Sequence, residues 1–109
     1  PAGNPRMTRQ RVLGYGFGDK LVSVRQVNRP VLELRANLPD TIARFAAEIE
    51  AAVAEGADSV ILGCMALFGV AAQIPAAVPV VDPALAALTS AEAMVRMGLN
   101  NSQKPALAA

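Results

Sequence analysis

From residue 37 onward, the sequence alternates between segments of helical periodicity and short apolar runs rich in β-branched residues. The order is helix, strand, helix, strand, helix, and the connections are short. Such alternation is typical of parallel strands, because a crossover, usually a helix, must bring the chain back before the next strand can run in the same direction. We therefore expect an α/β fold in which a parallel sheet carries helices on both faces.

The strongest helix signal covers residues 37–56. Asn37 is suited to cap this helix, Pro39 to occupy its first turn, and Gly56 to end it in a left-handed conformation. Apolar side chains recur three or four residues apart on one face, at Ile42, Phe45, Ala46, Ile49 and Val53. That face should pack against the sheet.

The predicted strands lie on either side of a second helix. Residues 59–62 and 78–81 are continuous apolar runs, which predict strands buried on both faces of the sheet. Residues 65–74 are expected to form a helix between them. A last helix is expected from Pro83 to Gly98, with Asp82 as its cap.

The first third of the chain carries weaker signals. Residues 6–13 resemble the end of a helix, the alternation over residues 21–27 predicts a half-exposed strand, and residues 31–34 predict a short extended piece. We divide the chain into an N-terminal loop and helix remnant (1–18), an α/β domain (19–99) and a polar C-terminal tail (100–109).

Composition removes whole classes of chemistry. The chain has no histidine and a single cysteine, Cys64. It therefore has no Ser-His-Asp or Cys-His catalysis of its own, no histidine-based or cysteine-cluster metal site and no internal disulfide, and we expect neither metal nor cofactor. A free cysteine is typical of a reducing compartment, so we expect a cytoplasmic protein. We predict no signal peptide and no membrane span.

Charge is unevenly distributed along the chain. Seven basic and two acidic residues occur up to Arg35, and three basic and seven acidic residues follow it. A basic end can indicate nucleic-acid binding, but these arginines are scattered and no nucleic-acid-binding motif accompanies them. We therefore expect no nucleic-acid or membrane partner. The basic region should be a solvated surface or should face an acidic neighbour.

Cys64 follows the first predicted buried strand and opens the next predicted helix. Ligands of parallel α/β sheets bind at the carboxyl ends of the strands, and Asp82 marks a second such end. Gly63 would permit a tight turn with an unusual φ, while a helix N-terminus would favour a thiolate and could hold a substrate oxyanion. The alternative is an inert cysteine packed in the core as a small apolar side chain.

Four stretches of the sequence share their order and spacing with one protein family. They are residues 56–64 (GADSVILGC), 78–83 (VPVVDP), 20–34 (with LVSVR and PVLEL) and 97–104 (MGLNNSQK). Together they resemble the aspartate/glutamate/hydantoin racemase superfamily, and its hydantoin racemase branch in particular, over about residues 15–104. The resemblance covers only the C-terminal half of a family member.

The resemblance implies two pseudo-symmetric racemase-like α/β domains, of which this chain holds one, incomplete. It implies a cofactor-independent racemase, an isomerase in which one thiolate removes a proton from a substrate carbon and an opposite thiol returns one to the other face. Carried over, Cys64 is the second-domain acid/base, and Gly63 with the backbone N–H groups of Cys64 and Met65 holds substrate oxygens. The implied partners are a small hydantoin-like or carboxylate substrate, a missing N-terminal half or second chain, and further copies in a homo-oligomer.

The sequence departs from this family's pattern just after Cys64. Met65-Ala66 stands where the hydantoin branch has Ala-Gly. The Thr and His that follow this cysteine in amino-acid racemases of the superfamily are absent, which argues against aspartate or glutamate as the substrate. Met65, with Leu67 and Phe68, predicts an apolar pocket wall, unless these side chains are ordinary helix packing.

Two other functions stay open at this point. Some superfamily members need only the second cysteine and protonate one face of an intermediate, as in the decarboxylation of a disubstituted malonate. The other alternative is that the chain is a truncated, non-catalytic α/β domain. Its uncovered sheet edge or apolar face would then drive self-association.

Overall fold

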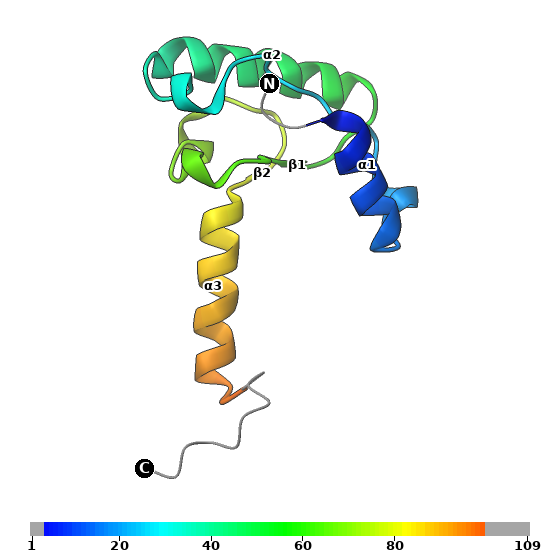
Figure 1. Cartoon of the computed structure of the whole chain (residues 1–109), viewed down its shortest axis with the longest axis vertical. Helices are drawn as coiled ribbons and strands as arrows, with labels where there is room; N and C mark the ends of the chain where they lie inside the picture. The colour runs from blue at the N-terminus through cyan, green and yellow to red at the C-terminus, as the bar shows by residue number, and fades with distance from the viewer. Residues whose placement is uncertain (1–3, 100–109) are drawn as a thin grey trace.

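The computed structural model of the chain describes residues 4–99, apart from the side chain of Ala66. Two parallel strands lie under one long helix, and a second long helix leads away from them (Figure 1). The elements are α1 (Pro5–Gly14), η1 (Gly18–Lys20), η2 (Val31–Glu33), α2 (Leu38–Ala54), β1 (Val60–Ile61), η3 (Met65–Leu67), η4 (Ala71–Gln73), β2 (Val80–Val81) and α3 (Pro83–Arg96), where η marks a single 3-10 turn.

The strands pair as the alternation of segments predicts. β1 and β2 are parallel, with Val60 opposite Val80 and Ile61 opposite Val81. The connection between them passes through η3 and η4 rather than through a full helix. The α/β class with a parallel sheet is therefore confirmed, although each strand has only two residues in regular pairing.

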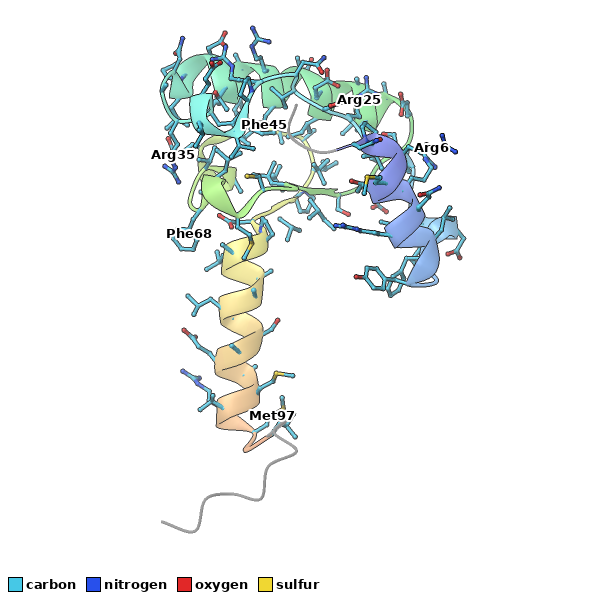
Figure 2. The ribbon with its side chains drawn as sticks, viewed as in Figure 1. Arg6, Arg25, Arg35, Phe45, Phe68 and Met97 are labelled. Carbon is cyan, nitrogen blue, oxygen red and sulfur yellow. The ribbon has the colours of Figure 1, made fainter. Side chains whose placement is uncertain are left out.

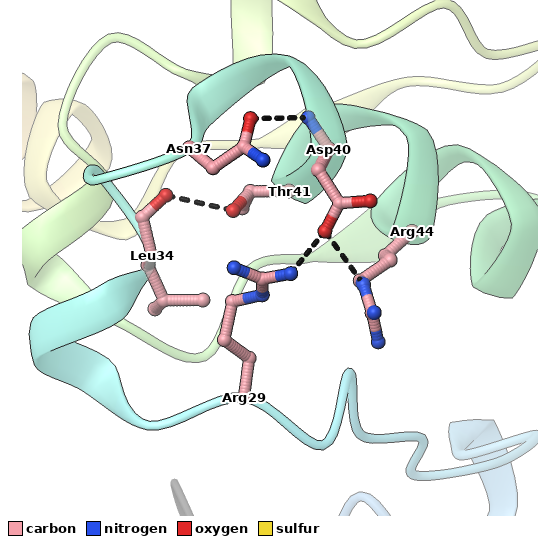
Figure 3. A network of polar contacts seen from close by, with 6 residues as sticks. All are labelled: Arg29, Leu34, Asn37, Asp40, Thr41 and Arg44. Atoms are coloured by element: carbon pink, nitrogen blue, oxygen red, sulfur yellow. Dashed lines mark hydrogen bonds and ion pairs between the residues drawn. The ribbon is translucent and has the colours of Figure 1, made fainter.

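The core lies between α2 and the sheet. The capping predicted for α2 is present, because the Asn37 side chain accepts a hydrogen bond from the Asp40 N–H, and Gly56 follows the helix with a φ of 107°. The fully buried Thr41 hydroxyl donates to the Leu34 carbonyl at 2.7 Å, which fixes η2 against the helix (Figure 3). The buried apolar cluster consists of Leu34, Ile49, Leu62, Leu67, Val70 and Ile74.

Only one face of the sheet is covered within residues 4–99. Val60 and Val80 pack against the core under α2, whereas Ile61 is 71% and Val81 37% exposed on the opposite face. The prediction of strands buried on both faces is wrong at these two positions. The reason is the direction of α3, which leads away from the sheet instead of folding back over it (Figure 1).

Two segments differ from their predicted form. Residues 21–27 have the alternation of a strand but pair with no other strand in the described structure, so they remain irregular. Residues 65–74 form two separate 3-10 turns, not a helix, because Gly69 between them has a φ of 83° that an α-helix cannot contain. Residues 31–33 are likewise a 3-10 turn and not an extended piece.

The two ends of the described chain are helical. α1 occupies most of the predicted N-terminal remnant, and α3 begins and ends where Asp82 and Gly98 predict. α3 buries none of its side chains. The predicted tail, residues 100–109, lies outside the described residues. None of the helices in residues 4–99 has both the length and the hydropathy needed to cross a membrane.

Candidate functional site

Cys64 lies just beyond the carboxyl end of β1, as the sequence predicts. Its backbone is extended, with φ −137° and ψ 123°, and it directly precedes η3. The side chain is half-buried: one part packs against the core cluster, and Cys64 also lines a cavity of about 490 Å³. The residue is thus neither sealed in the core nor fully exposed.

Four parts of the described chain provide most of the lining of this cavity, and one of them is α1, through Pro5, Thr8 and Val12. One wall is the irregular segment of residues 20–29, and another is β1 with the residues that follow it, up to Cys64. The apolar side chains of Phe45, Ile49 and Ala52 on α2 form a further side. Figure 2 shows Phe45 pointing from α2 into the space above the strands.

Two arginines that line the cavity are engaged by carboxylates of α2. Arg25 pairs with Glu48 at 2.6 Å and Glu55 at 2.7 Å, and the hydrogen bond to Glu48 is the main reason that the pKa of Arg25 is raised. Arg29 pairs with Asp40, which also accepts a hydrogen bond from Arg44 at 2.9 Å (Figure 3). Part of the basic charge of the N-terminal region therefore faces acidic groups within the chain itself.

The turn after Cys64 is held in place by Asp82. One oxygen of this buried carboxylate accepts the Gly69 N–H at 2.7 Å, and the other accepts the N–H groups of Ala84 and Leu85 at 3.0 and 3.2 Å. The Gly69 N–H is the main cause of the lowered pKa of Asp82, acting against the opposing effect of burial. The capping role of Asp82 is visible in the sequence, but the bond to Gly69 joins residues thirteen apart and has no sequence signal.

A second contact holds the same turn from the side of η2. The Arg35 guanidinium donates to the Phe68 carbonyl oxygen at 2.9 Å. Phe68 itself points outward at the edge of the molecule (Figure 2) and is 52% exposed. The loop between β1 and β2 is thus fixed at two successive residues, Phe68 and Gly69.

Several expectations for the surroundings of Cys64 need correction. No α-helix begins at Cys64, so the helix dipole expected there is absent and only the three-residue turn η3 follows. Gly63 lines the cavity, but its φ lies outside the left-handed region. The apolar wall predicted from Met65, Leu67 and Phe68 is not part of this cavity, because Leu67 belongs to the core while Met65, 58% exposed, and Phe68 lie outside the cavity lining.

The described residues offer no metal site. Across residues 4–99, no three side chains of the types His, Cys, Asp or Glu gather closely enough to hold an ion. The polar groups that line the cavity are hydroxyl and amide side chains, such as those of Ser23 and Asn28, together with charged side chains that include Arg25 and Arg29. The arrangement therefore provides one thiol at the carboxyl end of a strand, next to a space with apolar and polar walls.

Comparison with known proteins agrees with this architecture. The sequence profile of the Asp/Glu/hydantoin racemase family matches residues 1–91. The chain belongs to this family. It is 33% identical over 98 residues to a hydantoin racemase from Paenarthrobacter aurescens. The crystal structure of an allantoin racemase from Pseudomonas fluorescens superposes with a TM-score of 0.81 and 32% identity, over 91% of this chain.

The racemase relatives are much longer than this chain. It spans 42% of the Paenarthrobacter aurescens hydantoin racemase and 43% of the Pseudomonas fluorescens allantoin racemase. The family membership and the α/β fold predicted from the resemblance are confirmed. The roles of Cys64, Gly63 and Met65 stay predictions.

Proposed function

We propose that this chain is the second-cysteine half of a cofactor-independent racemase of the hydantoin type. The observation that carries the proposal is the position of Cys64, half-buried at the carboxyl end of β1 and lining a cavity of about 490 Å³. Parallel α/β sheets bind their ligands at this end. The match to racemases named for hydantoin and allantoin supports a small cyclic amide as the substrate class.

The chemistry assigned to Cys64 is the transfer of one proton. As a thiolate, Cys64 accepts the proton bound to the stereogenic carbon of the substrate, and the electron pair of that C–H bond moves into the adjacent carbonyl as an enolate. A thiol on the opposite face then gives a proton to the same carbon, which inverts the configuration. Because the chain has one cysteine, the opposite thiol must come from another part of the enzyme.

The substrate oxygens are assigned to the backbone near Cys64. The Cys64 and Met65 N–H groups would stabilise the negative charge that develops on the carbonyl oxygen, and Gly63, which lacks a side chain, leaves room for a ring. A Cβ at position 63 would have no heavy atom within 4 Å, apart from those of its chain neighbours. These groups act without the helix dipole expected from the sequence.

The proposal is tested by restoring racemisation with the part of the enzyme that this chain lacks. The chain is combined with the portion of the Paenarthrobacter aurescens hydantoin racemase that it does not match, and the loss of optical rotation of a 5-substituted hydantoin is followed. We expect Cys64→Ala and Cys64→Ser to lower the rate roughly 10²–10⁴-fold, because serine keeps the shape but barely ionises near neutral pH.

Glu50→Ala, on an exposed position of α2, is the matched control and should leave the rate unchanged. Full activity of the Cys64→Ala variant would show that Cys64 has no catalytic role. If deuterium from D₂O were incorporated into one enantiomer alone, the result would favour the single-cysteine chemistry of the family over racemisation.

A further inference from the structure

Two contacts in the loop after Cys64 act on one and the same peptide bond. The C=O of Phe68 and the N–H of Gly69 belong to the planar unit that joins these two residues, called here the 68–69 peptide. The Asp82 carboxylate accepts its N–H at 2.7 Å, and the Arg35 guanidinium donates to its C=O at 2.9 Å. An anion on one edge and a cation on the other therefore hold this peptide plane.

The 68–69 peptide is the centre of a type II β-turn. The Val70 N–H closes the turn on the Leu67 carbonyl at 2.9 Å. Phe68 has φ −49° and ψ 128°, and Gly69 has φ 83°, close to the values of about −60°, +120° and +80° that define this turn. Both ends are fixed in the core, since Leu67 and Val70 are each 1% exposed. The peptide between them is the part of the turn that can still rotate.

A type I turn is the alternative form with the same ends. It differs by a rotation of the 68–69 peptide, which brings ψ of Phe68 to about −30° and φ of Gly69 to about −90°. Glycine adopts either φ, so its own conformational preference does not decide between the two turns. The rotation would direct the C=O toward Asp82 and the N–H toward Arg35, acceptor against acceptor and donor against donor. The two charged side chains therefore favour the type II form.

This turn follows directly after the backbone groups assigned to the substrate oxygens. η3 connects Cys64 to it through a long hydrogen bond, from the Leu67 N–H to the Cys64 carbonyl at 3.4 Å, and no side chain caps η3. With so little support within η3, the backbone of Met65 takes its position from the two ends of the segment. One end is β1, and the other is the turn of residues 67–70.

We propose that Asp82 and Arg35 are positioning residues for the proton transfer at Cys64. They hold the 68–69 peptide in its type II orientation, and this orientation places the backbone N–H groups of Cys64 and Met65 for the developing enolate oxygen. The inference rests on the proposed function, because these N–H groups matter only if a substrate oxygen binds there. Asp82 has the larger share, since it is 8% exposed whereas Arg35 is exposed.

The variant Asp82→Asn separates this role from the capping of α3. Asparagine caps helices well, and its one acceptor oxygen can serve the N–H groups of Ala84 and Leu85 that Asp82 now caps. Its NH₂ group then faces Gly69 and cannot accept the N–H of that residue. α3 keeps its cap, while the 68–69 peptide loses its anionic partner.

Racemisation is measured on the chain combined with the unmatched part of the Paenarthrobacter aurescens hydantoin racemase. We expect Asp82→Asn to lower kcat about 10–100-fold with KM within about twofold of the parent, because misplaced donors matter most once charge develops on the oxygen. Arg35→Met should lower kcat in the same way by only about two- to tenfold, because its contact is exposed. A parental kcat in Asp82→Asn would overturn the inference.

Gly56→Ala is the matched control for a loss of stability alone. Gly56 has a φ of 107° after α2 and does not line the cavity of about 490 Å³, so this variant strains the backbone without touching the turn. We expect its unfolding midpoint to fall while its kcat stays that of the parent. A kcat as low as that of Asp82→Asn would assign the effect to stability and overturn the positioning role.

Hydrogen exchange on the chain alone tests the contact without any activity. In Asp82→Asn, the Gly69 amide should exchange at least tenfold faster than in the parent, whereas the Leu85 amide should keep its protection. Unchanged exchange at Gly69 would overturn the inference, because the carboxylate would then not be holding this N–H.

Failure of this inference is distinguishable from failure of the proposed function. Full activity of Cys64→Ala would reject the proposed chemistry, whatever the exchange at Gly69 shows. A loss of activity in Cys64→Ala together with a parental kcat in Asp82→Asn would support the role of Cys64 and reject the positioning role of Asp82.

Discussion

The carboxyl ends of β1 and β2 lie side by side, but the chain leaves them in different ways. After β2, Asp82 caps α3 with its own side chain, and fourteen helical residues follow. After β1, Cys64 precedes a three-residue turn to which no side chain gives a cap. The end at Asp82 is therefore organised locally, whereas the end at Cys64 depends on contacts from other parts of the fold.

Those contacts can be identified residue by residue. Leu67 and Val70 are each 1% exposed, so the turn after Cys64 is held mainly by burial. The Asp82 carboxylate and the Arg35 guanidinium then fix the backbone at Gly69 and Phe68. The site proposed for proton transfer therefore takes its shape from the core and from the neighbouring strand end.

The largest effect is expected from truncating Leu67, the buried side chain that holds the turn after Cys64. Leu67→Ala should lower the free energy of unfolding by about 2–5 kcal/mol, because it leaves a cavity in the core. Leu88→Ala, at a half-exposed position on α3, should change it by under about 0.5 kcal/mol. Urea denaturation followed by circular dichroism measures both, and equal effects would show that the two ends are held alike.

A smaller effect is expected from the backbone of the same turn. Gly69 has a φ of 83°, so Gly69→Ala should cost roughly 1–2 kcal/mol of stability, although an added Cβ would meet no atom within 4 Å. Gly63→Ala is the matched control, with a φ outside the left-handed region, and should stay within about 0.5 kcal/mol. If both variants unfold at the same urea concentration, the conformation of Gly69 does not hold the turn.

The smallest expected effect is a contribution of Asp82 to stability that is present near neutral pH and is lost in acid. The pKa of Asp82 is lowered from 3.8 in the folded chain, so its ionised form stabilises the fold at pH values above 3.8. This stability is lost as the pH falls through the lowered pKa. Comparing the unfolding midpoints of the parent and of Asp82→Asn from pH 6 to pH 2 isolates the contribution, because the other carboxylates are shared. We expect the difference between them to shrink with acid, and a constant difference would contradict the role of Asp82.

Local signals predicted some elements well and others poorly. Asn37, Pro39 and Gly56 mark the limits of α2, and Asp82 and Gly98 those of α3, because caps and left-handed glycines act within a turn of the residues they influence. The alternation in residues 21–27 predicted a strand that did not form. A strand, unlike a helix, takes its hydrogen bonds from another segment, and no described segment provides them.

By itself, the sequence determined the family, the two capped helices α2 and α3, the two parallel strands and the place of Cys64 after the first of them. Only the tertiary structure decided that Cys64 precedes a 3-10 turn, that Met65 and Phe68 are exposed and lie outside the cavity lining, and that the Asp82 carboxylate accepts the Gly69 N–H. The physical reason is the distance along the chain over which each interaction acts. Capping and periodicity depend on residues a few positions apart. The burial of Leu67 and the contact between the two strand ends join residues that only folding brings together.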